Sequence, residues 1–182
     1  MQWSPQFRLA LLATWLSVAA CTPGDLPSAA EQGDVQRARE LLAAGAAPAA
    51  TDSAGMSALH WAARRGDAEL THLLIVAGAP LELADERTWT PLHYAAAEGH
   101  ADALSALLAH GARVDGRAAA NFTPLHLAVV NSRYGAARLL IAAGADLEAR
   151  GMEDRTPLEF ARNRADQAMV ALLERAAEER GE

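Results

Sequence analysis

Three residue features, which serve as marks of a repeat, recur every 33 residues and limit this chain to a repeating architecture. A unit of this length cannot bury its own apolar face, but several stacked units can, so the period predicts a repeat array. The marks are a leucine, a glycine and an apolar pair: Leu59, Leu92, Leu125 and Leu158; Gly45, Gly78, Gly111 and Gly144; Leu41-Leu42, Leu74-Ile75, Leu107-Leu108 and Leu140-Ile141.

The composition and the local signals favour two helices in each unit. Alanine makes up about a quarter of the chain and leucine follows it, which favours helix over strand. Thr90 followed by Pro91 is typical of a helix start, and Gly99 of a helix end. The spacing of Leu104 and Leu107 indicates a second helix beyond that glycine.

The clearest unit runs from Thr90 to Ala112 and reads TPLHYAAAEGHADALSALLAHGA. This unit resembles the ankyrin repeat family. The resemblance extends from Leu26 to the C-terminus and implies one ankyrin repeat domain over residues 26–182. Its fold would be an all-α solenoid of about five helix–turn–helix units joined by β-turn fingers. Three units depart from the pattern: the first lacks the Thr-Pro-Leu-His box, the second has Ser57 and Ala58 in place of Thr-Pro, and in the fifth Glu159 replaces the histidine.

Both ends of the predicted array carry polar side chains. Polar outer faces suit the solvent-exposed ends of a solenoid, so we expect a complete array with polar end caps. The polar residues are Glu31, Gln32, Arg37 and Arg39 in the first unit and Arg162, Asn163 and Arg164 in the last.

The segment before the array is typical of a targeting signal. Arg8 and the amino terminus precede an apolar run over residues 9–20, which is too short to span a bilayer. Residues 1–20 are therefore predicted to be a signal peptide.

The run ends in Val18-Ala19-Ala20-Cys21, which resembles the lipobox of bacterial lipoproteins. The resemblance implies cleavage before Cys21, lipidation of Cys21 and a short linker over residues 21–25. It implies an outer-membrane lipoprotein facing the periplasm. Two alternatives stay open: an ordinary signal-peptidase site that leaves a free thiol in a soluble periplasmic or secreted protein, and a buried helix.

His60, His93 and His126 recur at one position of the repeat. The resemblance implies a structural role, in which each ring bonds the Thr hydroxyl and nearby backbone and ties the fingers together. Rings one unit apart lie about 10 Å from each other, too far to share a metal ion. We expect no metal, no cofactor and no catalytic residue, since no motif gathers a nucleophile, a base and an acid.

The resemblance also places a binding surface on the finger tips and the inner helices. Large apolar residues in a row on an exposed edge would form an apolar patch of the kind that marks interfaces. Alternatively, Trp89 and Phe122 pack against neighbouring fingers. Thr88 replaces a glycine and is expected to alter the geometry of its finger. The candidate partner-binding residues are Met56, Trp89, Phe122 and Arg155 on the fingers, and Arg64, Arg65, Glu98 and Asn131 near the inner helices.

These features together predict a monomeric, non-enzymatic protein–protein interaction module anchored in the bacterial envelope. Its unidentified protein partner would lie near the membrane surface, with membrane contact through the lipid alone. A net charge of −7 with no lysine argues against nucleic-acid binding. The alternatives are an inhibitor or immunity protein for an envelope hydrolase or toxin, a stabiliser of an envelope enzyme, and a hydrolase hidden in the array.

Overall fold

The computed structural model describes residues 25–181, and within them it confirms the all-α class. This part of the chain has ten α-helices, two short 3₁₀ turns and no strand beyond a single bridge between Thr51 and Ser57. The helices are α2 (Asp25–Gln32), α3 (Val35–Ala43), α4 (Ala58–Arg65), α5 (Ala68–Val76), α6 (Pro91–Glu98), α7 (Ala101–Ala109), α8 (Pro124–Val130), α9 (Tyr134–Ala142), α10 (Pro157–Asn163) and α11 (Gln167–Arg180).

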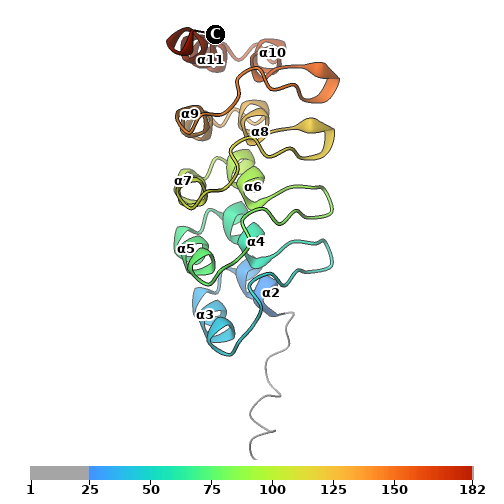
Figure 1. The fold of residues 1–182 in the computed structure, drawn as a ribbon, viewed down its shortest axis with the longest axis vertical. Coiled ribbons are helices and arrows are strands. Elements are labelled where there is room, and N and C mark those ends of the chain that lie inside the picture. The colour runs from blue at the N-terminus through green and yellow to red at the C-terminus, as the bar shows by residue number, and fades with distance from the viewer. Residues whose placement is uncertain (1–24, 182) are drawn as a thin grey trace, which may run out of the picture.

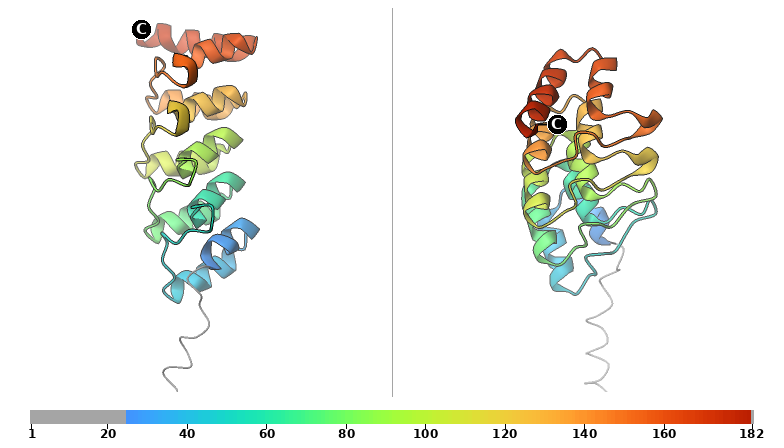
Figure 2. Two further views of the ribbon diagram at one scale, coloured as in Figure 1. Left: turned by 90° about the vertical axis from the view of Figure 1, so that its right-hand side faces the viewer. Right: turned by 45° about the horizontal axis from the view of Figure 1, so that its top comes forward.

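The helices pair into five units that stack along one axis (Figure 1). The even-numbered helices form an inner row and the odd-numbered helices form an outer row, and each helix packs mainly on its own unit and on the adjacent ones. The segment before each inner helix from α4 to α10 is a finger, and Figure 2 shows these fingers projecting in a row from one side of the stack. Such an arrangement gives an extended surface between the fingers and the inner helices.

Local signals in the sequence start and stop the inner helices. Ser57, Thr90, Thr123 and Thr156 each begin a helix with a capping box, in which the residue three positions on bonds back to the cap. Gly66 ends α4 in the left-handed conformation, with φ of 72°. The predicted helix start and end signals are therefore confirmed for these units.

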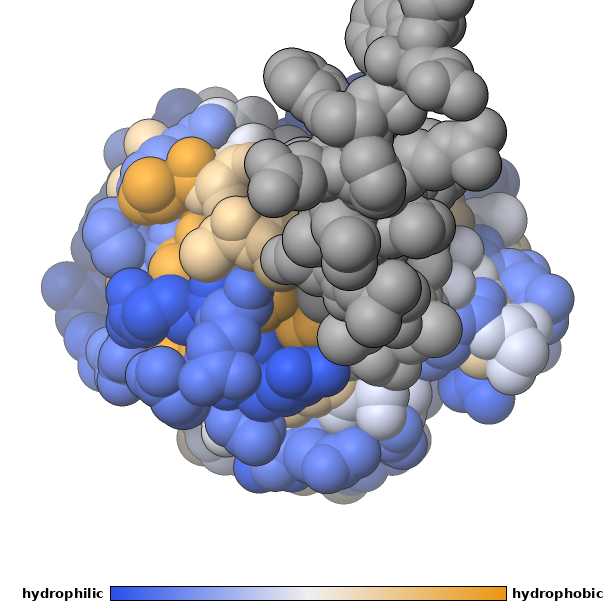
Figure 3. Space-filling view, turned by 90° about the horizontal axis from the view of Figure 1, so that it is seen from below, coloured by the Kyte–Doolittle hydropathy of each residue, from blue (hydrophilic) through white to orange (hydrophobic). Residues whose placement is uncertain are grey.

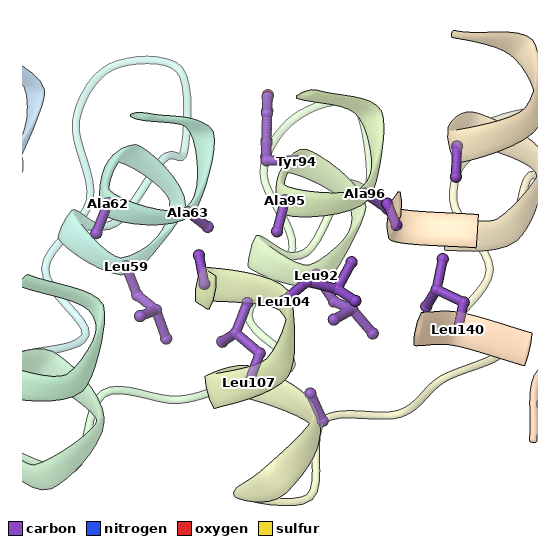
Figure 4. Close-up of a cluster of buried hydrophobic side chains, with 14 of the residues drawn as sticks. Leu59, Ala62, Ala63, Leu92, Tyr94, Ala95, Ala96, Leu104, Leu107 and Leu140 are labelled. Carbon is purple, nitrogen blue, oxygen red and sulfur yellow. The ribbon is translucent and has the colours of Figure 1, made fainter. Parts of the chain in front are cut away.

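The core is one continuous layer of leucine and alanine (Figure 4). Leu59 and Leu92 from the inner row and Leu107 and Leu140 from the outer row are fully buried between the two rows. Small side chains such as Ala95 lie on the inner helices themselves, where they permit close approach of neighbouring units. The apolar seam therefore joins all five units, as the 33-residue period predicts.

The four fingers are built in two ways. In units two and three a carboxylate, Asp52 or Asp85, accepts hydrogen bonds from the backbone of its own finger. In units four and five the equivalent positions are Ala118 and Gly151, and a 3₁₀ turn forms instead, Ala119–Asn121 or Met152–Asp154.

Thr88 adopts the left-handed conformation that the finger requires, with φ of 62°. Its backbone N–H donates to Asp85 O at 2.9 Å, just as that of Gly55 donates to Asp52 O at 3.1 Å in the preceding finger. The expectation of an altered finger at Thr88 was therefore wrong, because the surrounding hydrogen bonds hold the turn despite its β-branched residue.

The ends of the described array are polar. Glu31, Gln32, Arg37 and Arg39 are exposed on the first unit, and hydrophilic side chains cover much of that end where Figure 3 leaves it visible. Helix α2 begins at Asp25, so the last residue of the predicted linker is helical. The predicted signal peptide (residues 1–20), the lipidated Cys21 and the rest of the linker lie outside the described residues.

Candidate functional site

A hollow of about 500 Å³ lies between the fingers and the inner helices of units two and three. Residues from two fingers, two inner helices and the loop after α8 surround it, so its shape depends on the stacking of three units. Its lining consists of Ala54, Met56, Asp85, Glu86, Arg87 and Trp89 from the fingers, Trp61, Arg64, Tyr94, Ala97 and Glu98 from the inner helices, and Asn131 and Arg133 beyond α8.

Two aspartates fix the wall that the fingers form. Asp85 is buried and accepts from the backbone N–H groups of Arg87 and Trp89 through Oδ1, and from the Tyr94 hydroxyl at 2.6 Å through Oδ2. Asp52 repeats the pattern one unit earlier, with Trp61 Nε1 donating to Oδ2 at 2.8 Å. Each finger is thereby tied to the aromatic ring of the inner helix behind it.

Aromatic rings supply the apolar surface of the hollow. Trp89 is half-buried and packs against Tyr94, with 5.0 Å between ring centroids. Trp61 is half-buried and carries the Arg64 guanidinium over its ring at 5.2 Å from the centroid. This distance is within the range of a cation–π contact, which holds Arg64 along the edge of the hollow.

The charged residues of the lining differ in how they are paired. Glu98 and Arg133 form an ion pair at 3.6 Å, and Arg133 Nε also donates to Ala97 O at 3.0 Å. Burial and the hydrogen bond with Asp85 raise the pKa of the Tyr94 hydroxyl. The positive charges of Arg87 and Arg64 act in the opposite direction on the same pKa, with a smaller effect.

The repeat histidines link each inner helix to the following finger. In His93 the Nδ1 atom accepts from the Thr90 backbone N–H at 3.2 Å, and Nε2 donates to Gly116 O at 3.1 Å in the next finger. His60 and His126 make the equivalent bonds, to Trp89 O at 3.0 Å and to Arg155 O at 3.2 Å.

This bonding fixes the protonation state of the rings. A backbone N–H can only donate and a carbonyl can only accept, so Nδ1 carries no proton and Nε2 carries one. Burial lowers the pKa of the His93 imidazole to about 4, against the smaller opposing effect of its bonds to the backbone of Phe122 and Gly116. Burial likewise lowers the pKa of His60 and of His126. The three imidazole rings are therefore neutral, and their hydrogen bonds connect neighbouring units.

The structure brings together five of the eight predicted partner-binding residues. Arg64, Trp89, Glu98 and Asn131 line the hollow with exposed or half-buried side chains. Met56 also borders the hollow but is only 4% exposed, because its side chain packs into the core. The expectation that Met56 is an exposed finger residue was therefore wrong.

The other three predicted residues lie outside the hollow. Phe122 packs against Phe160 at 5.4 Å between centroids, so it does not continue an exposed apolar row with Trp89. Arg155 is half-buried and pairs with Glu153 at 2.6 Å. Arg65 donates to Glu31 O at 3.1 Å and connects two units. The predicted row of large apolar residues on the fingers is thus interrupted at both of its ends.

Sequence reasoning missed several residues of the lining. Trp61, Tyr94 and Asp85 were not singled out, and neither were Arg87 and Arg133. The 33-residue period carries a signal for some of them, since Trp61 and Tyr94 follow the two repeat histidines directly and Asp85 repeats Asp52.

Within residues 25–181 no group of three or more His, Cys, Asp or Glu side chains has the arrangement of a metal site. Across the same residues, no helix is both long and apolar enough to span a membrane.

The stacked two-helix units, with their capping boxes and the hollow between fingers and inner helices, define a repeat solenoid. A family model described as ankyrin repeats (3 copies) matches residues 26–118 and again residues 67–151, which together cover more than half of the chain. The chain therefore belongs to the ankyrin repeat family, whose repeats indicate a protein–protein interaction module. No curated protein matches the sequence.

Proposed function

We propose that this protein binds a partner protein through the hollow of units two and three. The observation that carries the proposal is the gathering of Trp61, Trp89 and Tyr94 with Arg64 and Arg87 around one cavity. Tryptophan, tyrosine and arginine are the residues that contribute most to binding at protein interfaces. Among residues 25–181 this lining is suited to recognition, because aromatic rings and charged groups border the same hollow.

The hollow is preformed, which favours tight binding. Asp52 and Asp85 hold the fingers through bonds to backbone N–H groups and to the rings of Trp61 and Tyr94. Because these groups are ordered before a partner arrives, association loses less conformational entropy there.

A matched pair of substitutions tests this site. Trp89 and Phe122 occupy the same repeat position and are both half-buried, but only Trp89 borders the hollow. We expect Trp89→Ala to lose the partner that crosslinks to the wild-type protein in intact cells, as read by mass spectrometry, whereas Phe122→Ala retains it. Urea unfolding of both variants checks that the array stays folded. Retention by Trp89→Ala, or equal loss in the two variants, contradicts the assignment.

We also propose that the protein is exported and anchored in the bacterial envelope through lipid on Cys21. The apolar run over residues 9–20 and the sequence Val18-Ala19-Ala20 before Cys21 support this. More than one acyl chain would be needed for a stable anchor, since a single chain binds a membrane only marginally. Membrane fractionation of Cys21→Ser tests the anchor: the wild type should sediment with membranes, and continued membrane association of the processed variant contradicts lipid anchoring.

An anchor at Cys21 would keep the array beside the membrane. Helix α2 begins at Asp25, and the four residues to it span at most about 14 Å when extended. We therefore expect the partner to lie close to the membrane surface. A long flexible insertion after Cys21 should abolish crosslinking to that partner, and unchanged crosslinking would argue against the short tether.

A further inference from the structure

Two arginines of the hollow have no anionic partner among residues 25–181. Arg64 and Arg87 are exposed, and neither forms an ion pair with any residue that the structure describes. Both line the same hollow, Arg64 from the last turn of helix α4 and Arg87 from the next finger, and the charge of each lowers the pKa of the Tyr94 hydroxyl. The chain carries a net charge of −7, whereas the lining of the hollow is balanced, with three arginines against Asp85, Glu86 and Glu98.

Two of the three carboxylates in the lining of the hollow are already bonded to other lining residues. Asp85 accepts three hydrogen bonds from Arg87 N, Trp89 N and the Tyr94 hydroxyl, and Glu98 pairs with Arg133. Glu86 is the exception: it is exposed and has no side-chain partner among residues 25–181. The lining therefore offers two available guanidinium groups against one available carboxylate.

We infer that the hollow selects a partner segment that carries an aspartate or glutamate next to an apolar side chain. This inference rests on the proposed function. The planar guanidinium groups of Arg64 and Arg87 match the two oxygens of a carboxylate. The rings of Trp61 and Trp89 cover the neighbouring apolar side chain. Glu86 weakens this selection by repelling the same carboxylate, so its removal strengthens binding.

An immobilised library of short peptides is the probe. Each peptide has leucine at its centre, and the residue beside it is Asp or Glu, Asn or Gln, or Lys. The full chain with its signal removed is added at low and at high salt. The expected result is a preference for Asp and Glu over their amides of roughly three- to tenfold for each arginine engaged, and this preference weakens as salt screens the charges.

Charge variants of the hollow make the test sharp. Arg64→Gln and Arg87→Gln should each reduce the preference, and Glu86→Gln should increase it. The double variant Arg64→Glu with Arg87→Glu should reverse the preference toward Lys, a result that unfolding cannot produce. Arg138→Gln is the matched control, because Arg138 is also exposed and makes no ion pair among the described residues, but it lies on the outer helix α9.

The outcomes separate this inference from the proposed function. No enrichment of Asp or Glu, including no binding to the library, overturns the inference, as does a preference that survives in Arg64→Glu with Arg87→Glu. If Trp89→Ala still loses the cellular partner in that case, the hollow remains the binding site and only its charge selection is wrong. If Trp89→Ala retains the partner, the proposed function itself fails.

Discussion

Lowering the pH from 8 to 5 should weaken the array, because its fold holds the repeat histidines in the neutral form. His93 accepts a hydrogen bond from the Thr90 N–H through Nδ1, and a proton on that atom would face a donor. The pKa of His93 is about 4 in the folded protein, against an ordinary value of 6.5. Burial also lowers the pKa of His60 and the pKa of His126.

The sign and size of the effect follow from proton linkage. Between pH 6.5 and pH 4 the unfolded chain binds a proton at position 93 that the folded chain does not. The stability that neutral His93 contributes is therefore complete above about pH 6.5 and is lost as the pH falls toward 4. At about pH 5 the loss from His93 alone is about 2 kcal/mol, and His60 and His126 add to it.

Urea unfolding of the purified protein, followed by circular dichroism at several pH values, measures this loss. His93→Gln removes the titrating ring, while its amide oxygen can still accept from Thr90 N–H, as the Glu159 carboxylate accepts from Thr156 N–H at 2.8 Å. The variant loses the bond to Gly116 O, so it should be less stable at pH 8 by about 1–2 kcal/mol. Its further loss between pH 8 and pH 5 should be smaller than that of the wild type by about 2 kcal/mol.

The control is His110→Gln, which changes an exposed imidazole at the end of the outer helix α7 and should keep the wild-type curve. Equal free energies of unfolding for the wild type at pH 8 and pH 5 would refute the reasoning. An unchanged pH dependence in His93→Gln would refute the assignment to His93.

Three further substitutions and one control substitution probe single features of the fold by urea unfolding. Thr71→Val should stabilise the protein by about 1 kcal/mol, because the buried Thr71 hydroxyl finds no hydrogen-bond partner among the described residues; a loss of stability would show that it is satisfied. Thr88→Gly should also stabilise by about 1 kcal/mol by relieving a left-handed β-branched residue, and no gain would mean that the turn is unstrained. Gly66→Ala should cost about 2 kcal/mol or more, because its Cβ would lie 2.4 Å from His100 Nδ1 in addition to the strain at positive φ. Gly45→Ala, with φ of 92° and open space around the added carbon, should cost less; equal costs would mean that the contact with His100 has no effect.

The repeat could be predicted from the sequence because its signals are local and periodic. The 33-residue spacing and the Thr-Pro and glycine signals fixed the helix pairs, and Ala95 and Leu92 occupy the core as that spacing requires. These signals are residue types and spacings that reflect local backbone preferences and the burial of one helix face. They can therefore be read from one sequence.

The candidate binding site was harder to predict, because spacing gives the position of a residue but not the direction of its side chain. Met56, Trp89 and Phe122 share one repeat position, yet they are respectively buried, on the hollow, and packed against Phe160 from the next unit. The difference comes from contacts between units that no local pattern encodes.

The exchange of histidine for Glu159 makes the units of this protein chemically unequal. A histidine at this position offers an N–H to the following finger, as His126 does to Arg155 O. A carboxylate moved to an inner unit would instead face that carbonyl oxygen, with two acceptors opposed and no hydrogen between them. At this position units three and four carry the same imidazole, whereas the fifth unit cannot be moved inward in a redesigned array unless its glutamate is replaced by histidine.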